Sequence, residues 1–152
     1  MNLYSEFRQI IGVLNREGVA YALCGGMAMA VYDLPRATMD IDLLILVEDL
    51  EKVRTLAKEC GYTIDTGSFK IAAAGSQIYR MAKIAGEDEE PFVLDLLLAD
   101  GELKEVWDGR QDMEWDSGRL SVVSREGLVK MKRLRGSGKD QDDIDFLTEN
   151  EN

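Results

Sequence analysis

A short alternation of acidic and apolar residues constrains this chain more than any other feature. Asp40 and Asp42 flank one apolar residue at the start of a strand-like segment, and Asp95 lies inside the apolar run 92–98. Successive side chains on a strand point to opposite faces, so Asp40 and Asp42 share a face that Asp95 can join from a neighbouring strand. Three adjacent carboxylates repel one another unless a cation lies between them. Oxygen-only ligands suit Mg²⁺ or Mn²⁺, so the pattern predicts a metal site.

A diglycine, Gly25-Gly26, is the second informative feature, and thirteen residues separate it from the acidic pair. It follows a short apolar segment and precedes a helix-like run, which predicts a strand-to-helix turn. A backbone without side chains can approach a phosphate closely, and a helix N-terminus presents N–H groups to an anion. Taken alone, such a pair more often indicates an ordinary tight turn. The acids downstream favour the phosphate site.

These motifs, in this order and at this spacing, resemble the nucleotidyltransferase superfamily typified by DNA polymerase beta and the kanamycin nucleotidyltransferases. A further match lies near the other end of the chain. There the Lys-rich segment 128–135 and the acidic segment 139–144 resemble small bacterial members related to abortive-infection type E toxins. The matched segments extend from about residue 21 to residue 147.

The resemblance implies both a fold and a reaction. The fold class would be α/β (α+β), with the minimal nucleotidyltransferase architecture of a mixed β-sheet, helices mainly on one face and a short C-terminal helical segment at about 124–148. The enzyme would move a nucleoside monophosphate from a nucleoside triphosphate to an acceptor hydroxyl and release pyrophosphate. Asp40 and Asp42 would hold two Mg²⁺ or Mn²⁺ ions. Asp95 would complete one ion site and help to deprotonate the acceptor.

The resemblance also implies which residues bind the nucleotide. Gly25 and Gly26 would hold the β- and γ-phosphates, and Lys132 would add a point charge there. Further nucleotide-binding residues would be Arg36, Thr38 and Arg135. For Lys132 and Arg135 a solvated helix face is an equally simple interpretation. Arg36 is a phosphate clamp in one interpretation and a surface loop residue in the other.

Asp95 also has a structural interpretation. A carboxylate in the middle of an apolar strand is costly to bury unless something pairs with it. That partner is either the predicted metal centre or, in the alternative, a salt bridge to Arg80.

Two other function classes stay open at this point. One is a toxin–antitoxin component that modifies or binds a partner protein or a transfer RNA. The other is a nucleotide-binding module of the same fold that no longer turns over. A chain without catalysis has no physical need for a costly buried Asp95, which argues against the module.

Composition limits the partners. The 152 residues are 45% apolar, enough for one core, so residues 1–152 are expected to form a single domain. The net charge of -11 disfavours extended DNA or another long nucleic acid. Expected partners are a nucleoside triphosphate and an acceptor of unknown class, whether small molecule, protein or tRNA. A partner protein or a second copy of the chain could supply base selection.

The rarer residues and the hydropathy limit the chemistry and the location. The chain has no histidine, so imidazole bases and histidine–zinc sites are excluded. Its two cysteines lack metal-ligand spacing and are typical of reduced packing residues. No apolar run approaches the roughly 20 residues that span a bilayer. The sequence therefore predicts a cytoplasmic protein that does not enter a membrane.

Periodicity and breakers predict the order of the elements. Helices are expected at 3–17, 27–32, 50–60, 124–135 and 140–147, and strands at 19–24, 40–47, 69–74, 76–84 and 91–98. The last three strands should form a meander, and residues 113–115 and 120–123 an edge hairpin. The pattern between residues 103 and 112 indicates no element.

Overall fold

The computed structural model describes residues 2–32, 40–70, 77–116, 118–135, 144 and 147–148, with the backbone alone at 69, 70 and 135. Its helices are α1 (Leu3–Arg16), α2 (Gly25–Val31), the 3-10 turn η1 (Val47–Asp49), α3 (Leu50–Glu59), α4 (Leu103–Asp108) and α5 (Arg125–Arg135). Its strands are β1 (Ala22–Cys24), β2 (Asp40–Ile45), β3 (Ile64–Lys70), β4 (Gln77–Lys83), β5 (Phe92–Leu98), β6 (Gln111–Trp115) and β7 (Gly118–Val122).

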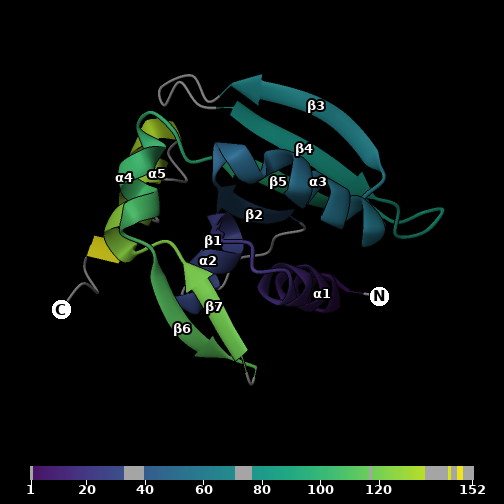
Figure 1. The fold of residues 1–152 in the computed structure, drawn as a ribbon, viewed down its shortest axis with the longest axis horizontal. Helices are drawn as coiled ribbons and strands as arrows, with labels where there is room; N and C mark the ends of the chain where they lie inside the picture. Colours follow the sequence, from purple (N-terminus) through teal and green to yellow (C-terminus); the bar gives the residue numbers. More distant parts are fainter. Residues whose placement is uncertain are drawn as a thin grey trace.

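The seven strands form one mixed sheet in the order β3-β4-β5-β2-β1-β7-β6 (Figure 1). Strand β2 pairs with β5, and β1 with β7, in parallel, whereas the other neighbours are antiparallel. The predicted meander is present as β3-β4-β5, and the predicted hairpin is the edge pair β6-β7. The predicted fold class is confirmed. Non-consecutive neighbours β2 and β5 bring the two predicted acidic strands together.

One face of the sheet carries the apolar contact with helices α1 and α3. Ile10 and Leu14 of α1 and Val53 and Leu56 of α3 meet around Leu94 of β5, and all five are buried. The two helices lie side by side in Figure 1. Because side chains alternate along β5, the neighbour of Leu94, Asp95, points to the opposite face. The sheet thus separates its main apolar contact from its acids.

Helix α1 begins and ends where its sequence predicts. The Asn2 side chain accepts a hydrogen bond from the Ser5 backbone N–H, and the Ser5 side chain lies 3.3 Å from the Asn2 backbone nitrogen, forming a capping box. Gly18 follows the last turn with φ of +67°, a left-handed conformation that glycine adopts easily.

Two elements differ from the sequence analysis: one strand begins earlier than predicted, and one helix was not predicted. Strand β3 begins at Ile64 rather than at residue 69, because it is a polar edge strand in which Asp65 and Ser68 flank a bulge at Gly67. Helix α4 had no sequence prediction. Its six residues bury Leu103, Val106 and Trp107, too short a run for helical periodicity to stand out.

The remaining elements shift by a few residues. Helix α2 starts two residues earlier than predicted, and β1 is shorter than the predicted strand. Ser124 caps α5 by accepting a hydrogen bond of 3.0 Å from the Gly127 N–H. Most of the predicted helix 140–147 lies outside the described residues; its two described members, Ile144 and Leu147, are buried.

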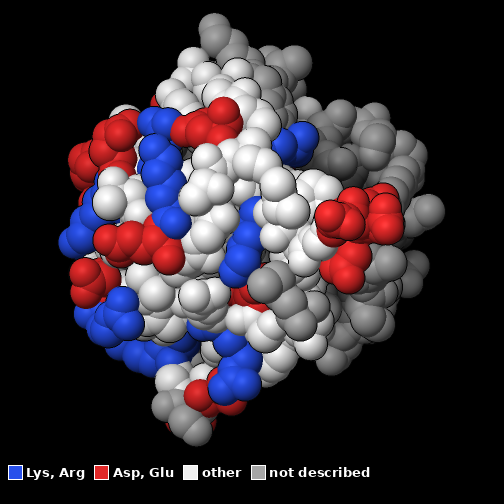
Figure 2. Space-filling view, turned by 90° about the vertical axis from the view of Figure 1, so that its right-hand side faces the viewer, with Lys and Arg blue, Asp and Glu red and all other residues white. Residues whose placement is uncertain are grey.

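The described surface mixes both signs of charge. On the face in Figure 2, Lys and Arg side chains lie among Asp and Glu side chains, so both signs of charge occur on the described part of that face. None of the described helices has the length and apolar character that crossing a membrane requires.

Candidate active site

Four side chains form a row across the middle of the sheet. Strand pairing places Cys24 of β1 opposite Asp42 of β2, Asp42 beside Asp95 of β5, and Asp95 opposite Arg80 of β4. Paired positions on adjacent strands point to the same face. The predicted approach of Asp95 to the acidic pair is therefore present. Asp40 lies two residues before Asp42 on the same face.

Arg80 holds Asp95 with two hydrogen bonds. Its Nε donates to Oδ1 at 2.8 Å and one Nη donates to Oδ2 at 2.9 Å, which is the bidentate geometry that fits a guanidinium to a carboxylate. The Asp95 side chain is 7% exposed, whereas that of Arg80 is 42% exposed. The structural interpretation of Asp95 is thus realised. The pair joins a buried acid to a base that reaches solvent.

The acidic face also carries Asp40 and Asp42 at its centre. Both residues are half-buried. Burial, and then the charge of Asp95, raise the pKa of Asp40, while Arg80 opposes the rise. The hydrogen bonding that Arg80 donates to Asp95 raises the pKa of Arg80, and the charges of Asp40 and Asp42 add to that effect. All three carboxylates and Arg80 therefore belong to one electrostatic cluster.

Gly25 lies against the Asp42 carboxylate. Its φ is +70°, and a Cβ built there would overlap Oδ2 and lie 2.8 Å from Cγ of Asp42. Any other residue would strain the backbone and displace the acid. The preceding residue adds a contact, because Cys24 Sγ donates to the Asp42 carbonyl at 3.4 Å. The predicted strand-to-helix turn therefore faces the predicted acids.

Lys132 approaches the same face from α5. It is 6% exposed, so the solvated-face interpretation does not hold for this residue. Burial and then the Asp42 charge raise the pKa of the Cys24 thiol, and the positive charge of Lys132 counteracts them. At the start of the helix, the Arg125 guanidinium stacks on the Tyr32 ring at 4.9 Å from its centroid.

Of the other predicted nucleotide-binding residues, the structure describes only Gly26 in full. Arg36 and Thr38 lie outside the described residues, as does the side chain of Arg135. Gly26 follows Gly25 as the second residue of α2. The acidic segment 139–143, part of the match to the small toxins, also lies outside the described part.

The acids of this face differ in how well they suit a divalent cation. Within the described ranges, no three acidic or cysteine side chains form a group that could hold one metal ion. Asp40 and Asp42 supply carboxylate oxygens on one face, which fit Mg²⁺ or Mn²⁺. Each oxygen of Asp95 already accepts a hydrogen bond from Arg80. The two acids of β2 thus fit a cation, and the ligand role of Asp95 stays a prediction.

The row contains one member that sequence reasoning left without a role. Cys24 was interpreted only as a packing residue, and its place opposite Asp42 follows from the antiparallel pairing of β1 with β2. The available signal was the position of Cys24 directly before the diglycine turn, since a strand that ends at this turn can pair with the acidic strand that follows. That pairing could have placed Cys24 beside the acids.

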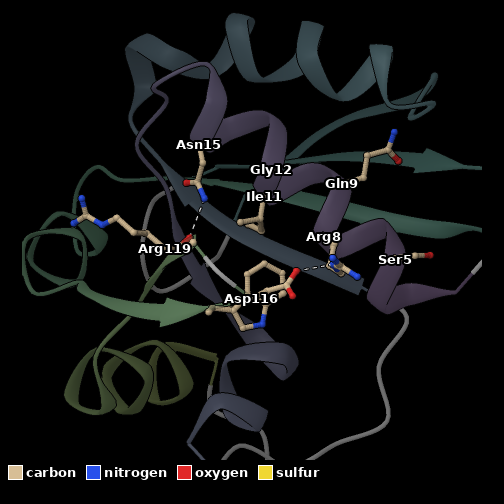
Figure 3. Close-up of a pocket in the computed structure, with 10 residues that line it drawn as sticks. Ser5, Arg8, Gln9, Ile11, Gly12, Asn15, Asp116 and Arg119 are labelled. Atoms are coloured by element: carbon tan, nitrogen blue, oxygen red, sulfur yellow. Dashed lines mark hydrogen bonds and ion pairs between the residues drawn. The ribbon is translucent and has the colours of Figure 1, made fainter.

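A groove of about 440 Å³ lies elsewhere, between α1 and the β6-β7 hairpin (Figure 3). Arg8 and Asp116 face each other across it at 2.8 Å, and Asn15 donates to the Arg119 carbonyl at 2.9 Å. Asp40, Asp42 and Asp95 do not line this groove. The acidic face is therefore the better candidate for catalysis.

Comparisons with known proteins bear on the fold. No family model matches the chain, and no curated protein matches it in sequence. Among solved structures, the lincosamide antibiotic adenylyltransferase LnuA with bound lincomycin has a TM-score of 0.64 at 18% identity, over 95% of each chain. ANT(2″)-Ia in complex with adenylyl-2″-tobramycin has a TM-score of 0.63 at 14% identity, over 97% of this chain and 88% of that one.

A third similar structure is a candidate nucleotidyltransferase from Thermotoga maritima. Its TM-score is 0.58 at 15% identity, over 94% of this chain and 91% of that one. The fold is that of the nucleotidyltransferases. At these identities the likeness establishes the architecture, and the activity must be argued from the residues.

Proposed function

We propose that this chain is a metal-dependent nucleotidyltransferase, which transfers a nucleoside monophosphate from a nucleoside triphosphate to an acceptor hydroxyl and releases pyrophosphate. One observation carries the proposal. The Asp40 and Asp42 carboxylates share one face of β2, directly beside the Gly25 turn, in the fold of the nucleotidyltransferases. Acids beside a glycine turn at a helix N-terminus suit a triphosphate with a bound cation.

Asp40 and Asp42 would hold Mg²⁺ or Mn²⁺. When bound, the cation neutralises charge that develops on the attacking and leaving oxygens. Gly25 and Gly26 would let the backbone approach the β- and γ-phosphates, since neither has a side chain. Lys132, whose buried charge reaches the row, would add a fixed positive charge for the triphosphate.

Asp95 would orient the acceptor hydroxyl and take its proton. Its two hydrogen bonds to Arg80 fix the direction of the carboxylate. A carboxylate has about four lone-pair sites, so two hydrogen bonds leave capacity for a third donor. The hydroxyl proton would pass to an Asp95 oxygen as the hydroxyl oxygen forms its bond to the α-phosphorus and the bond to pyrophosphate breaks.

The acceptor class is the finer part of the proposal. A small, cationic, hydroxylated molecule is favoured because the chain is strongly acidic and the site adds three carboxylates. LnuA was solved with lincomycin and ANT(2″)-Ia with an adenylylated tobramycin, and this chain matches them over most of their length. A protein or tRNA acceptor, as in the toxin–antitoxin hypothesis, rests on the C-terminal motif alone.

A transfer assay tests the function. The chain would be incubated with Mg²⁺ or Mn²⁺, each α-labelled nucleoside triphosphate in turn, and separate sets of cationic hydroxylated small molecules, tRNA and protein. We expect label on a small molecule, with pyrophosphate released in equal amount. Asp42→Asn should abolish the transfer, while Asp108→Asn, the same change at an exposed acid of α4, should not. Triphosphates that neither bind nor react with the wild-type chain would refute the proposal.

A further inference from the structure

Arg80 is the one residue of the acidic row that brings a positive charge with it. Its partner Asp95 is 7% exposed, and each of its carboxylate oxygens accepts one hydrogen bond from Arg80, at 2.8 and 2.9 Å. The strand ladder sets this arrangement, because Arg80 lies directly opposite Asp95 in the β4-β5 register. The pairing is therefore built into the sheet.

The same ladder connects Arg80 to the predicted cation ligands. Asp95 lies beside Asp42 in the parallel β2-β5 register, and Asp42 and Asp40 share that face. The guanidinium thus lies two strands from the acids that fit a metal, with Asp95 of β5 between them. The charges of Asp40 and Asp42 both act on Arg80, which supports the closeness that the register indicates. One fixed cation already compensates part of the charge of three carboxylates.

We propose that Arg80 takes the place of one metal ion, so that this centre uses a single divalent cation, held by Asp40 and Asp42. The proposal rests on the proposed function and departs from the two-ion arrangement that the family resemblance implies. A second divalent ion at Asp95 would have to displace a bidentate guanidinium or bind beside it, against like-charge repulsion. A guanidinium stays charged at any physiological pH and is bound covalently to the chain.

In the proposed reaction, Asp40 and Asp42 hold the cation, while Arg80 orients Asp95 on the same face. Asp95 keeps its orientation through Arg80 rather than through a metal, which makes Arg80 a positioning residue. Its side chain is 42% exposed, so part of it also meets solvent. The enzyme would then need one divalent cation for each bound triphosphate.

Counting Mn²⁺ by electron paramagnetic resonance tests this proposal. The full chain, saturated with a nucleoside triphosphate that carries a methylene bridge between the α- and β-phosphates, would be titrated with Mn²⁺. We expect one tightly bound ion per wild-type chain. Arg80→Gln removes the charge and keeps one N–H donor for Asp95, so this variant should bind two ions. Arg80→Lys keeps the charge and should still bind one.

A matched control separates local from general charge effects. Arg54→Gln removes an arginine that pairs with Glu51 and Asp65 in contacts away from the row, and the count should stay at one. Two tight ions in the wild type, or one in Arg80→Gln, would overturn the role of Arg80 without touching the proposed function. If Arg80→Gln does not fold, judged by circular dichroism, the wild-type and Arg80→Lys counts decide. A wild type that binds no triphosphate refutes both proposals.

Discussion

Strand β4 carries two ion pairs on opposite faces, and they differ in how completely their charges are satisfied. Lys83 donates to both Glu6 oxygens at 3.0 and 3.2 Å and to the Cys60 carbonyl at 3.1 Å, using all three of its hydrogens. The Tyr62 hydroxyl, fully buried, also donates to Glu6 at 3.2 Å. Arg80, on the other face, binds Asp95, and the charges of two further acids, Asp40 and Asp42, also act on it.

The difference distinguishes a structural cluster from a candidate site. The Lys83 cluster balances one acid with one base, closes around itself and joins α1 to the sheet. Burial and the Glu6 charge raise the pKa of Tyr62, which keeps that hydroxyl protonated as a donor. The acidic row instead carries more negative than positive charge beside a backbone turn. Such an excess is what a cationic ligand can relieve.

The largest effect is expected when the Lys83 cluster is broken. Lys83→Met should lower the free energy of unfolding by about 3–5 kcal/mol, because Glu6 would stay buried without its partner. Lys104→Met removes an exposed pair with Asp108 and should cost less than about 1 kcal/mol. Urea melts of both variants measure the two costs. Similar costs would mean that the closed cluster contributes no more than a surface pair.

The next largest effect concerns metal binding at the acidic row. At Mn²⁺ concentrations about 100 times the Kd, the wild type should gain about 2.7 kcal/mol of stability, and Asp42→Asn should lose most of this gain. Without metal, the variant should be at least as stable as the wild type, since one of three like charges is gone. Thermal melts with and without Mn²⁺ measure both. An equal gain in the two proteins would contradict the assignment of Asp42.

Sequence reasoning succeeded where the information was local. Alternation along a strand places Asp40 and Asp42 on one face whatever the rest of the chain does. It named Asp95 and both of its possible partners, but alternation fixes a face and not a register, so it could not choose between them. The register of β4 with β5 shows the pair with Arg80, and the metal role of Asp95 stays a prediction. Lys132 became buried through the packing of α5, which its own pattern of charges does not encode.

A smaller effect compares two glycines that share a conformation. Gly18 has φ of +67° with open space around its Cα, whereas Gly25 has φ of +70° with the Asp42 carboxylate against it. Gly18→Ala should cost about 1 kcal/mol of stability from strain alone. Gly25→Ala should cost about 2 kcal/mol more and should also abolish Mn²⁺ stabilisation, because Asp42 must move. Equal costs in denaturant melts would show that Gly25 serves only the turn.

The smallest effect tests whether α5 contributes to nucleotide binding. Lys132→Met keeps the apolar stem and the helix propensity but removes one buried charge from beside the row. Triphosphate binding should weaken on the order of tenfold, which corresponds to about 1.4 kcal/mol, and nucleoside binding should not change. Calorimetry with a nucleoside, its monophosphate and its triphosphate should show a loss that grows with the number of phosphates.

Lys130→Met is the matched control on the same helix. Lys130 contacts Glu105 and Glu102 on the side that faces α4, so its removal should leave nucleotide affinity unchanged. If both variants weaken the triphosphate equally, the effect is one of net charge and not of position. If neither does, Lys132 is a buried structural cation like Lys83, and the nucleotide site rests on Gly25, Asp40 and Asp42. A loss confined to Lys132→Met would place α5 at the phosphates and extend the open row by one residue.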